Sequence, residues 1–130
     1  MKYLTEAQVL ALHRQMVGAF GGADAVRDPD LLRSALGAPF QTFAGMPLHP
    51  GLTERAAHLG YGIIRNHPFA DGNKRTGLHT MLVFLAVNGV ALDYDAEAMT
   101  DLILRTAAGE CTAEEICAFL DRCPRHTVNW

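Results

Sequence analysis

Apolar residues recur every three or four positions in the first part of the chain, which is the spacing of one face of an α-helix. Thr5 and Gln8 precede them in the arrangement of a capping box, and Gly21-Gly22 follows as a stop signal. The pattern predicts a first helix that begins after Thr5 and ends before Gly21. The apolar positions of this helix, which we expect in the core, are Val9, Leu12, Met16 and Phe20.

Similar signals predict five further helices. Asp28 before a proline marks one start, and Thr112 with Glu115 forms a second capping box. His67 ends another helix, because the residue before a proline avoids the α-helical region. The expected ranges are 29–36, 53–66, 73–87, 96–108 and 113–122.

The helix expected at 73–87 is apolar nearly all round, which is typical of the central helix of a small bundle. Most connections are short, and residues 90–94 form at most a short extended link. The exception is the Pro- and Gly-rich stretch 38–52, for which we expect a loop with one short helical turn. The sequence therefore predicts an all-α fold, a compact bundle of about six helices with little or no sheet.

Composition and charge narrow the class of protein. The 130 residues fit one domain over residues 1–130, and the net charge of -3 provides no basic surface for direct binding of nucleic acid. The longest apolar run is too short to cross a membrane, and the N-terminus lacks a signal-peptide core. The three cysteines have neither zinc spacing nor the pattern of a disulfide framework. We therefore expect a cytoplasmic protein with idle or buried thiols.

One segment, HPFADGNKRTG at residues 67–77, contains an unusual density of polar side chains. It lies between two expected helices, so its second half forms a helix N-terminus with unpaired N–H groups and a positive dipole end. Gly72 lets the backbone approach a ligand, and Lys74 and Arg75 add positive charge at the same place. These features predict an anion site that suits phosphate.

Two further side chains of this segment bear on catalysis. His67 can act as the base that accepts a proton from an attacking hydroxyl, and Asp71 can hold a divalent cation beside substrate phosphates. Such a set suits phosphoryl or nucleotidyl transfer. The residues alone also allow a structural interpretation, in which Asp71 is only a cap and Lys74 and Arg75 face solvent. The sequence has no Walker A pattern, so a P-loop is excluded.

The stretch HPFADGNKR resembles the signature H-x-F-x-[D/E]-x-N-[G/K]-R of the Fic/Doc family. The apolar helix after it, the following Asn-Gly, and the segments ALHRQMVGAFGG and DPDLL are also similar to the Doc branch. The resemblance covers roughly residues 3–122, is weakest at 38–52, and leaves 123–130 as a C-terminal tail. It implies an all-helical fold with the active-site loop between two central helices.

The resemblance implies a transferase that uses ATP and Mg²⁺. Fic proteins transfer AMP, and they carry Gly after the motif Asn and a second Arg three residues after the first. This chain has Lys74 and Leu78 at those positions, and both departures resemble Doc. Doc-like proteins bind ATP in the reversed sense and transfer its γ-phosphate to a threonine of elongation factor Tu, which stops translation.

The matching positions then receive roles by resemblance. His67 is the general base, and Asp71 either orients the base and the target hydroxyl or holds Mg²⁺. Residues of the anion site bind the ATP phosphates, and Phe69 anchors the loop in the core. His79 either contacts substrate or is a satisfied helix histidine. The phosphate-binding set is Gly72, Asn73, Lys74 and Arg75.

The family also implies a partner. Fic enzymes often carry an inhibitory helix, but the nearest match here, residues 106–110, belongs to a helix of the bundle. We therefore expect a separate antitoxin whose helix docks on the active-site face. Phe40, Phe43 and Met46 are candidate contacts, although core packing is the favoured role for them. The alternatives to a Doc-like kinase toxin are a Fic-like AMP transferase and a non-catalytic phosphate-binding module.

Overall fold

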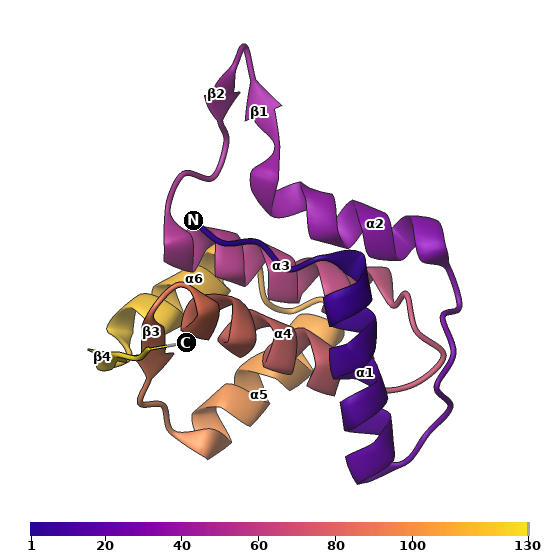
Figure 1. Cartoon of the computed structure of the whole chain (residues 1–130). Coiled ribbons are helices and arrows are strands. Elements are labelled where there is room, and N and C mark those ends of the chain that lie inside the picture. The colour runs from indigo at the N-terminus through magenta and orange to yellow at the C-terminus, as the bar shows by residue number, and fades with distance from the viewer. Residues whose placement is uncertain (130) are drawn as a thin grey trace.

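The computed structural model describes residues 1–129, and within them it has six α-helices and two small pairs of strands (Figure 1). The predicted all-α bundle is confirmed. The helices are α1 (Glu6–Phe20), α2 (Pro29–Gly37), α3 (Leu52–Asn66), α4 (Asn73–Val87), α5 (Ala96–Ala107) and α6 (Ala113–Arg122), with a 3-10 turn η1 (Ala38–Phe40) after α2.

The helix starts follow the predicted caps with one small difference. Thr5 Oγ1 accepts a hydrogen bond from the Gln8 N–H at 3.2 Å, as a capping box requires. α3 begins at Leu52, one residue earlier than expected. The reason is that Gly51 takes the N-cap position, where its N–H donates to Glu54 Oε1 at 3.3 Å.

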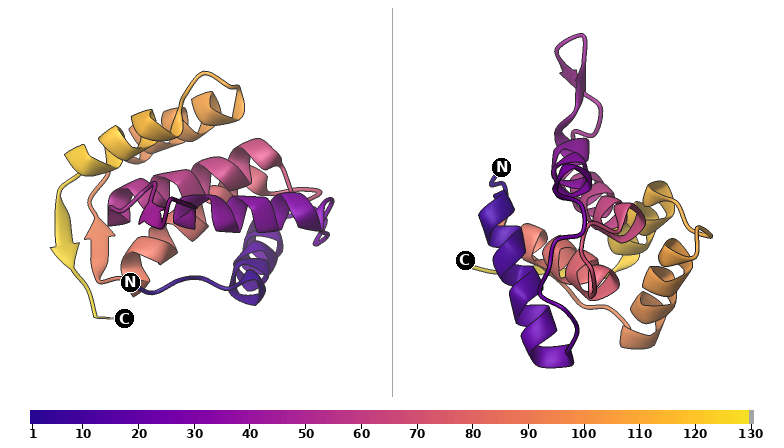
Figure 2. Two further views of the ribbon diagram at one scale, coloured as in Figure 1. Left: turned by 90° about the horizontal axis from the view of Figure 1, so that it is seen from above. Right: turned by 90° about the vertical axis from the view of Figure 1, so that its right-hand side faces the viewer.

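The two central helices are α3 and α4, and the other helices pack around them (Figure 2). Gly77 allows the two to approach closely, because a Cβ on this residue would lie 2.6 Å from Ile64 Cγ1. No helix within residues 1–129 has both the length and the apolarity needed to cross a bilayer. The largest fully buried side chains include Phe69, Phe84, Leu32, Ile63 and Met81.

The loop 38–52 contains a hairpin that the sequence did not predict. After the expected helical turn, β1 (Thr42–Phe43) pairs with β2 (Met46–Pro47) in antiparallel register. Ala44 and Gly45 both have positive φ, 51° and 79°, so the hairpin turns through a left-handed alanine that sequence rules do not anticipate.

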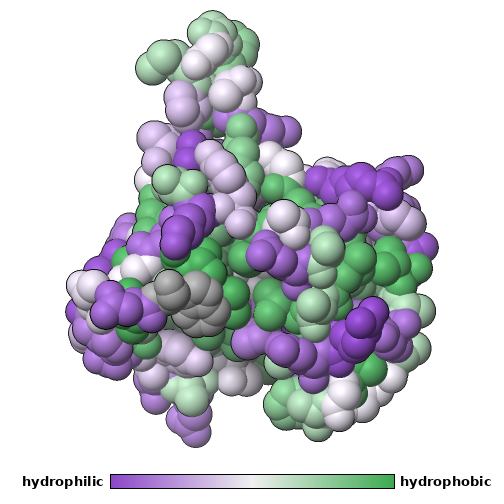
Figure 3. Space-filling view, in the orientation of Figure 1, coloured by the Kyte–Doolittle hydropathy of each residue, from purple (hydrophilic) through white to green (hydrophobic). Residues whose placement is uncertain are grey.

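The hairpin projects from the helical body and is apolar at its tip (Figure 3). Phe43 is 74% exposed and Met46 is 68% exposed, so the core packing that we favoured for them is wrong. Phe40, which precedes the hairpin, does pack on the core, with its ring 4.6 Å from Tyr3 and 6.1 Å from Phe84.

The second pair of strands joins distant parts of the chain. β3 (Val90–Leu92), in the expected extended link, pairs with β4 (Arg125–Thr127). The segment that we assigned as a C-terminal tail therefore contains a strand, which pairs with the residues that follow α4. Local patterns could not reveal this pairing, because its partners lie far apart in sequence.

α1 buries only part of the apolar face that we expected. Val9 is buried as predicted, but Phe20 at the end of the helix is exposed. His13 is instead the other buried side chain of this helix, with 1% of its surface exposed. The burial of His13 and its bond to the Asp71 carbonyl oxygen indicate a structural role.

Candidate active site

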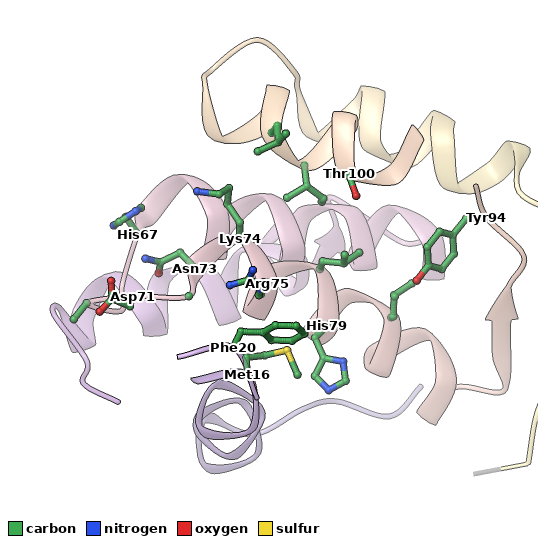
Figure 4. A pocket seen from close by; sticks show the side chains of 16 residues that line it. Met16, Phe20, His67, Asp71, Asn73, Lys74, Arg75, His79, Tyr94 and Thr100 are labelled. Atoms are coloured by element: carbon green, nitrogen blue, oxygen red, sulfur yellow. The ribbon is translucent and has the colours of Figure 1, made fainter. Parts of the chain in front are cut away.

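A cavity of about 770 Å³ lies where the end of α1, the start of α4 and the side of α5 meet (Figure 4). It combines a polar end, formed by residues 67–73, which we call the motif loop, with an apolar end between α4 and α5. A cavity of this size and mixed lining is typical of a small-molecule site. All the site residues predicted from the sequence line it, namely His67, Asp71, Gly72, Asn73, Lys74, Arg75 and His79.

The polar end is built on the N-terminus of α4. Gly72 takes the N-cap position with φ 78° and ψ 19°, a left-handed conformation that glycine adopts without strain. It provides no side-chain cap, and the first turn of α4 carries no acidic residue. Lys74 and Arg75 are both exposed there. The free N–H groups, the helix dipole and two cations therefore favour an anion at this point.

His67 ends α3 in an uncommon backbone conformation. Its φ of 54° and ψ of 52° are left-handed, which is rare for a residue other than glycine. The Arg27 side chain stabilises this bend, because Arg27 Nε donates to the His67 carbonyl oxygen at 2.8 Å. The imidazole is exposed to the cavity and makes no hydrogen bond within residues 1–129. It is therefore free to accept a proton from a bound hydroxyl.

Asp71 is held by the α1 side of the molecule rather than by His67. Its Oδ2 accepts a hydrogen bond from the Ala23 N–H at 2.8 Å, and its carbonyl oxygen accepts one from His13 Nε2 at 2.8 Å. No hydrogen bond joins Asp71 to His67 in the described part of the chain. Of the two roles implied for Asp71, the orientation of His67 therefore has no hydrogen bond to support it.

The same geometry bears on Mg²⁺. Residues 1–129 contain no group of three or more side chains that could ligate a metal ion by themselves. Mg²⁺, however, is commonly held by one or two carboxylates together with substrate phosphates. Asp71 has a carboxylate oxygen, Oδ1, outside its bond to Ala23, and it lies beside the anion site. The residues therefore fit a Mg²⁺ ion that arrives with a phosphate ligand.

The Asn73 side chain holds the loop together. Asn73 Oδ1 accepts from the Phe69 N–H, and Asn73 Nδ2 donates to the Phe69 carbonyl oxygen, both at 3.0 Å. The amide is buried, so the side chain of Asn73 closes the loop. Asn73 also lines the cavity, and its contact with phosphate stays a prediction. Phe69 is fully buried and stacks on His13 at 3.8 Å, which confirms it as the anchor of the loop.

Comparison with known proteins agrees with this geometry. A family model described as the Fic/DOC family matches residues 3–85. The chain belongs to this family. It is 40% identical over 104 residues to a protein named Toxin Doc from Mycolicibacterium smegmatis, covering 78% of this chain and 80% of that protein. It is 30% identical over 122 residues to the Protein kinase doc of Escherichia phage P1, covering 94% and 95%.

In this Fic/Doc protein the cations of the motif differ in their surroundings. Arg75 lies over the exposed Phe20 ring, with its Cζ 4.3 Å from the ring centroid, so a cation–π contact orients it. Lys74 makes no ion pair within residues 1–129. Leu78, one turn further along α4, belongs to the apolar end of the cavity. Burial lowers the pKa of His79, which favours the neutral form of this imidazole.

Sequence patterns missed the opposite wall of the Fic/Doc cavity. Phe20 was expected in the core because it continues the apolar spacing of α1, and no local signal marks the α5 residues. Only packing brings these helices to the motif. The missed lining residues are Met16 and Phe20 of α1, Tyr94 before α5, and Thr100, Ile103 and Leu104 of α5.

Proposed function

We propose that this protein is a Doc-type toxin that acts as a protein kinase. It transfers the γ-phosphate of ATP to a serine or threonine hydroxyl of a translation factor, elongation factor Tu, and so blocks translation in the cytoplasm. The observation that carries the proposal is Lys74 on the first turn of α4, in one cavity with His67, Asp71 and the apolar Leu78. The name of the phage P1 relative, Protein kinase doc, supports it.

The side chains divide the work of phosphoryl transfer. The α4 N-terminus, Lys74 and Arg75 bind the phosphates and stabilise negative charge. The target hydroxyl oxygen bonds to the γ-phosphorus while the bond from phosphorus to the β,γ-bridging oxygen breaks, which releases ADP. His67 takes the proton of the hydroxyl. Positioning and charge stabilisation supply most of the catalysis in such reactions.

Asp71 Oδ1 would hold Mg²⁺ together with the phosphates of ATP. When bound, the ion neutralises charge on the transferring group. Lys74 bears on which phosphate moves, because it adds a cation where AMP-transferring relatives have Gly, while Leu78 removes their second Arg. His79 would offer a neutral polar contact to the bound substrate.

A labelled-ATP experiment tests the reaction. Purified protein is incubated with elongation factor Tu and ATP labelled at either the α or the γ phosphate. Label from the γ position supports the kinase, and label from the α position means AMP transfer. Absence of transfer from both, to this factor and to any lysate protein, means a non-catalytic phosphate-binding module.

The Lys74→Gly variant tests whether Lys74 contributes to γ-phosphate transfer. We expect γ-transfer to fall by about 10²-fold, because one charged contact to the transition state is lost. Lys2→Ala is the control, since Lys2 is the only other lysine and lies outside the cavity. An unchanged rate and product in Lys74→Gly would mean that Lys74 does not determine which phosphate is transferred.

We also propose a separate antitoxin as the partner of this toxin. Phe20 and Leu104 are exposed large apolar residues, and both line the cavity. They suit the apolar face of a partner helix laid across the active-site face. The hairpin residues Phe43 and Met46 lie outside this cavity lining, so they are less suited to that helix.

A further inference from the structure

The connection between α1 and α2, residues 21–28, runs along the motif loop at the edge of the molecule where both lie (Figure 1). The Ala70 N–H donates to the Ala25 carbonyl oxygen at 2.9 Å, and the Arg27 N–H donates to the Pro68 carbonyl oxygen at 2.7 Å. Val26 forms an isolated antiparallel bridge with Phe69. We call residues 21–28 the strap.

The strap reaches the side chain of one active-site residue. The Ala23 N–H donates to Asp71 Oδ2 at 2.8 Å, a hydrogen bond to a charged acceptor. The Asp71 backbone is fixed from the same side, because His13 Nε2 bonds to its carbonyl oxygen at 2.8 Å. Asp71 is otherwise exposed, so these two contacts decide where its carboxylate lies.

Gly22 is the residue that permits this approach. A Cβ on Gly22 would lie 2.9 Å from Asp71 Cβ, which is closer than real Cβ atoms approach one another. Gly22 also has a φ of 109°. Its neighbour Gly21 has a similar φ of 87°, but a Cβ there would meet nothing within 4 Å. The two glycines therefore share the backbone strain of substitution and differ in the contact with Asp71.

We infer that the strap is a positioning element of the active site, in which Gly22 and the Ala23 N–H set the place of the Asp71 carboxylate. The Ala23 bond occupies Oδ2 and leaves Oδ1 for the cavity. Gly22 and Ala23 are positioning residues, because they act through Asp71 and do not line the cavity themselves. The inference rests on the proposed function only where it concerns ATP and transfer.

The first test measures the Asp71 contact without any ligand. Amide hydrogen exchange of Ala23 is followed by NMR in the unmodified protein, in Gly22→Ala and in Gly21→Ala. We expect exchange to be at least about tenfold faster in Gly22→Ala, with Gly21→Ala close to the unmodified protein. Equal Ala23 exchange in the two variants would overturn the inference. If Gly22→Ala does not fold, Asp71→Ala decides, because unchanged Ala23 exchange there means that the bond does not exist.

The second test measures what the positioning does. Binding of MgATP is measured by calorimetry, and we expect an affinity about 10- to 100-fold weaker in Gly22→Ala than in Gly21→Ala, as for other residues that orient a metal-binding carboxylate. Equal MgATP affinity would refute the inference. If even the unmodified protein neither binds MgATP nor transfers phosphate, the proposed function is wrong, and the Ala23 exchange still decides the role of the strap.

Discussion

The motif loop, residues 67–73, and the β1–β2 hairpin, residues 42–47, are both short connections next to α3, and both include a left-handed residue other than glycine. In the motif loop that residue, His67, is held by Arg27, and the adjoining backbone is bonded to the strap. In the hairpin it is Ala44, at an exposed tip.

The difference lies in what surrounds each turn. Phe69 at the centre of the motif loop is fully buried, and Asn73 satisfies both of its backbone polar groups. Phe43 in the hairpin is mostly exposed. Residues that their surroundings hold in an uncommon backbone conformation concentrate at functional sites. Of the two connections, the motif loop is therefore the one whose backbone the surrounding residues hold in place.

The largest effect is expected on chemistry at His67. His67→Asn keeps a side chain that tolerates the left-handed conformation but removes the base, so transfer should fall by about 10²- to 10⁴-fold. The rate of γ-label transfer measures this, with thermal unfolding as the check on folding. His126→Asn, at an exposed histidine of β4, is the control. Retained transfer in His67→Asn would remove His67 as the base.

The next effect is on the stability of the loop. Asn73→Ala leaves the buried N–H and carbonyl groups of Phe69 without partners, so the free energy of unfolding should fall by about 2–4 kcal/mol. Urea unfolding measures this. Thr42→Ala in the exposed hairpin is the matched polar control and should change it by less than about 0.5 kcal/mol. Equal losses of unfolding free energy in Asn73→Ala and Thr42→Ala would mean that the motif loop is held no more firmly than the hairpin.

A smaller effect on stability depends on pH. It is expected from His79 in the cavity wall and not from the hairpin, which has no titratable side chain. Burial lowers the pKa of His79 below 6.5, so the unfolded chain takes up this proton first as the pH falls. The contribution of His79 to stability is thus complete above pH 6.5 and is lost as the pH falls through its lower folded-state pKa. Thermal unfolding between about pH 7.5 and about pH 5.5 should show a shallower decline in His79→Gln than in the unmodified protein.

A second histidine, His58, also contributes to the pH dependence of stability. His58 also has a lowered pKa, first because of burial and then because of repulsion from His49, so part of the decline remains in His79→Gln. An identical pH profile in His79→Gln and the unmodified protein would mean that His79 titrates alike in both states.

The smallest effect is expected in the hairpin. Replacing both Phe43 and Met46 with serine should change the free energy of unfolding by less than about 0.5 kcal/mol, because neither side chain is buried. Urea unfolding measures this, and Phe69→Ser is the contrasting variant, with a large loss expected from a buried aromatic ring. A large loss from the hairpin pair would show that the hairpin packs on the body in solution.

Much of the fold was predictable because helix ends are local. The capping box at Thr5, the Asp28 cap and the pre-proline His67 each depend on residues within one turn, and the structure has them. The anion site at the start of α4 was predictable for the same reason, since Gly72, Lys74 and Arg75 are consecutive or nearly so. The two pairs of strands were not, because β4 needs β3 from far away and the hairpin turns at an alanine.

The amino-acid sequence by itself determined the six helices, the polar loop between α3 and α4, and the resemblance that identified the family. Tertiary structure alone decided that the Asn73 side chain closes the motif loop and that Phe20 lies outside the core, against Arg75. It also decided that the Ala23 N–H, next to Gly22, reaches the Asp71 carboxylate. Helix caps and dipoles act over a few residues of the chain. The placement of a carboxylate or a guanidinium depends instead on segments that only folding brings together.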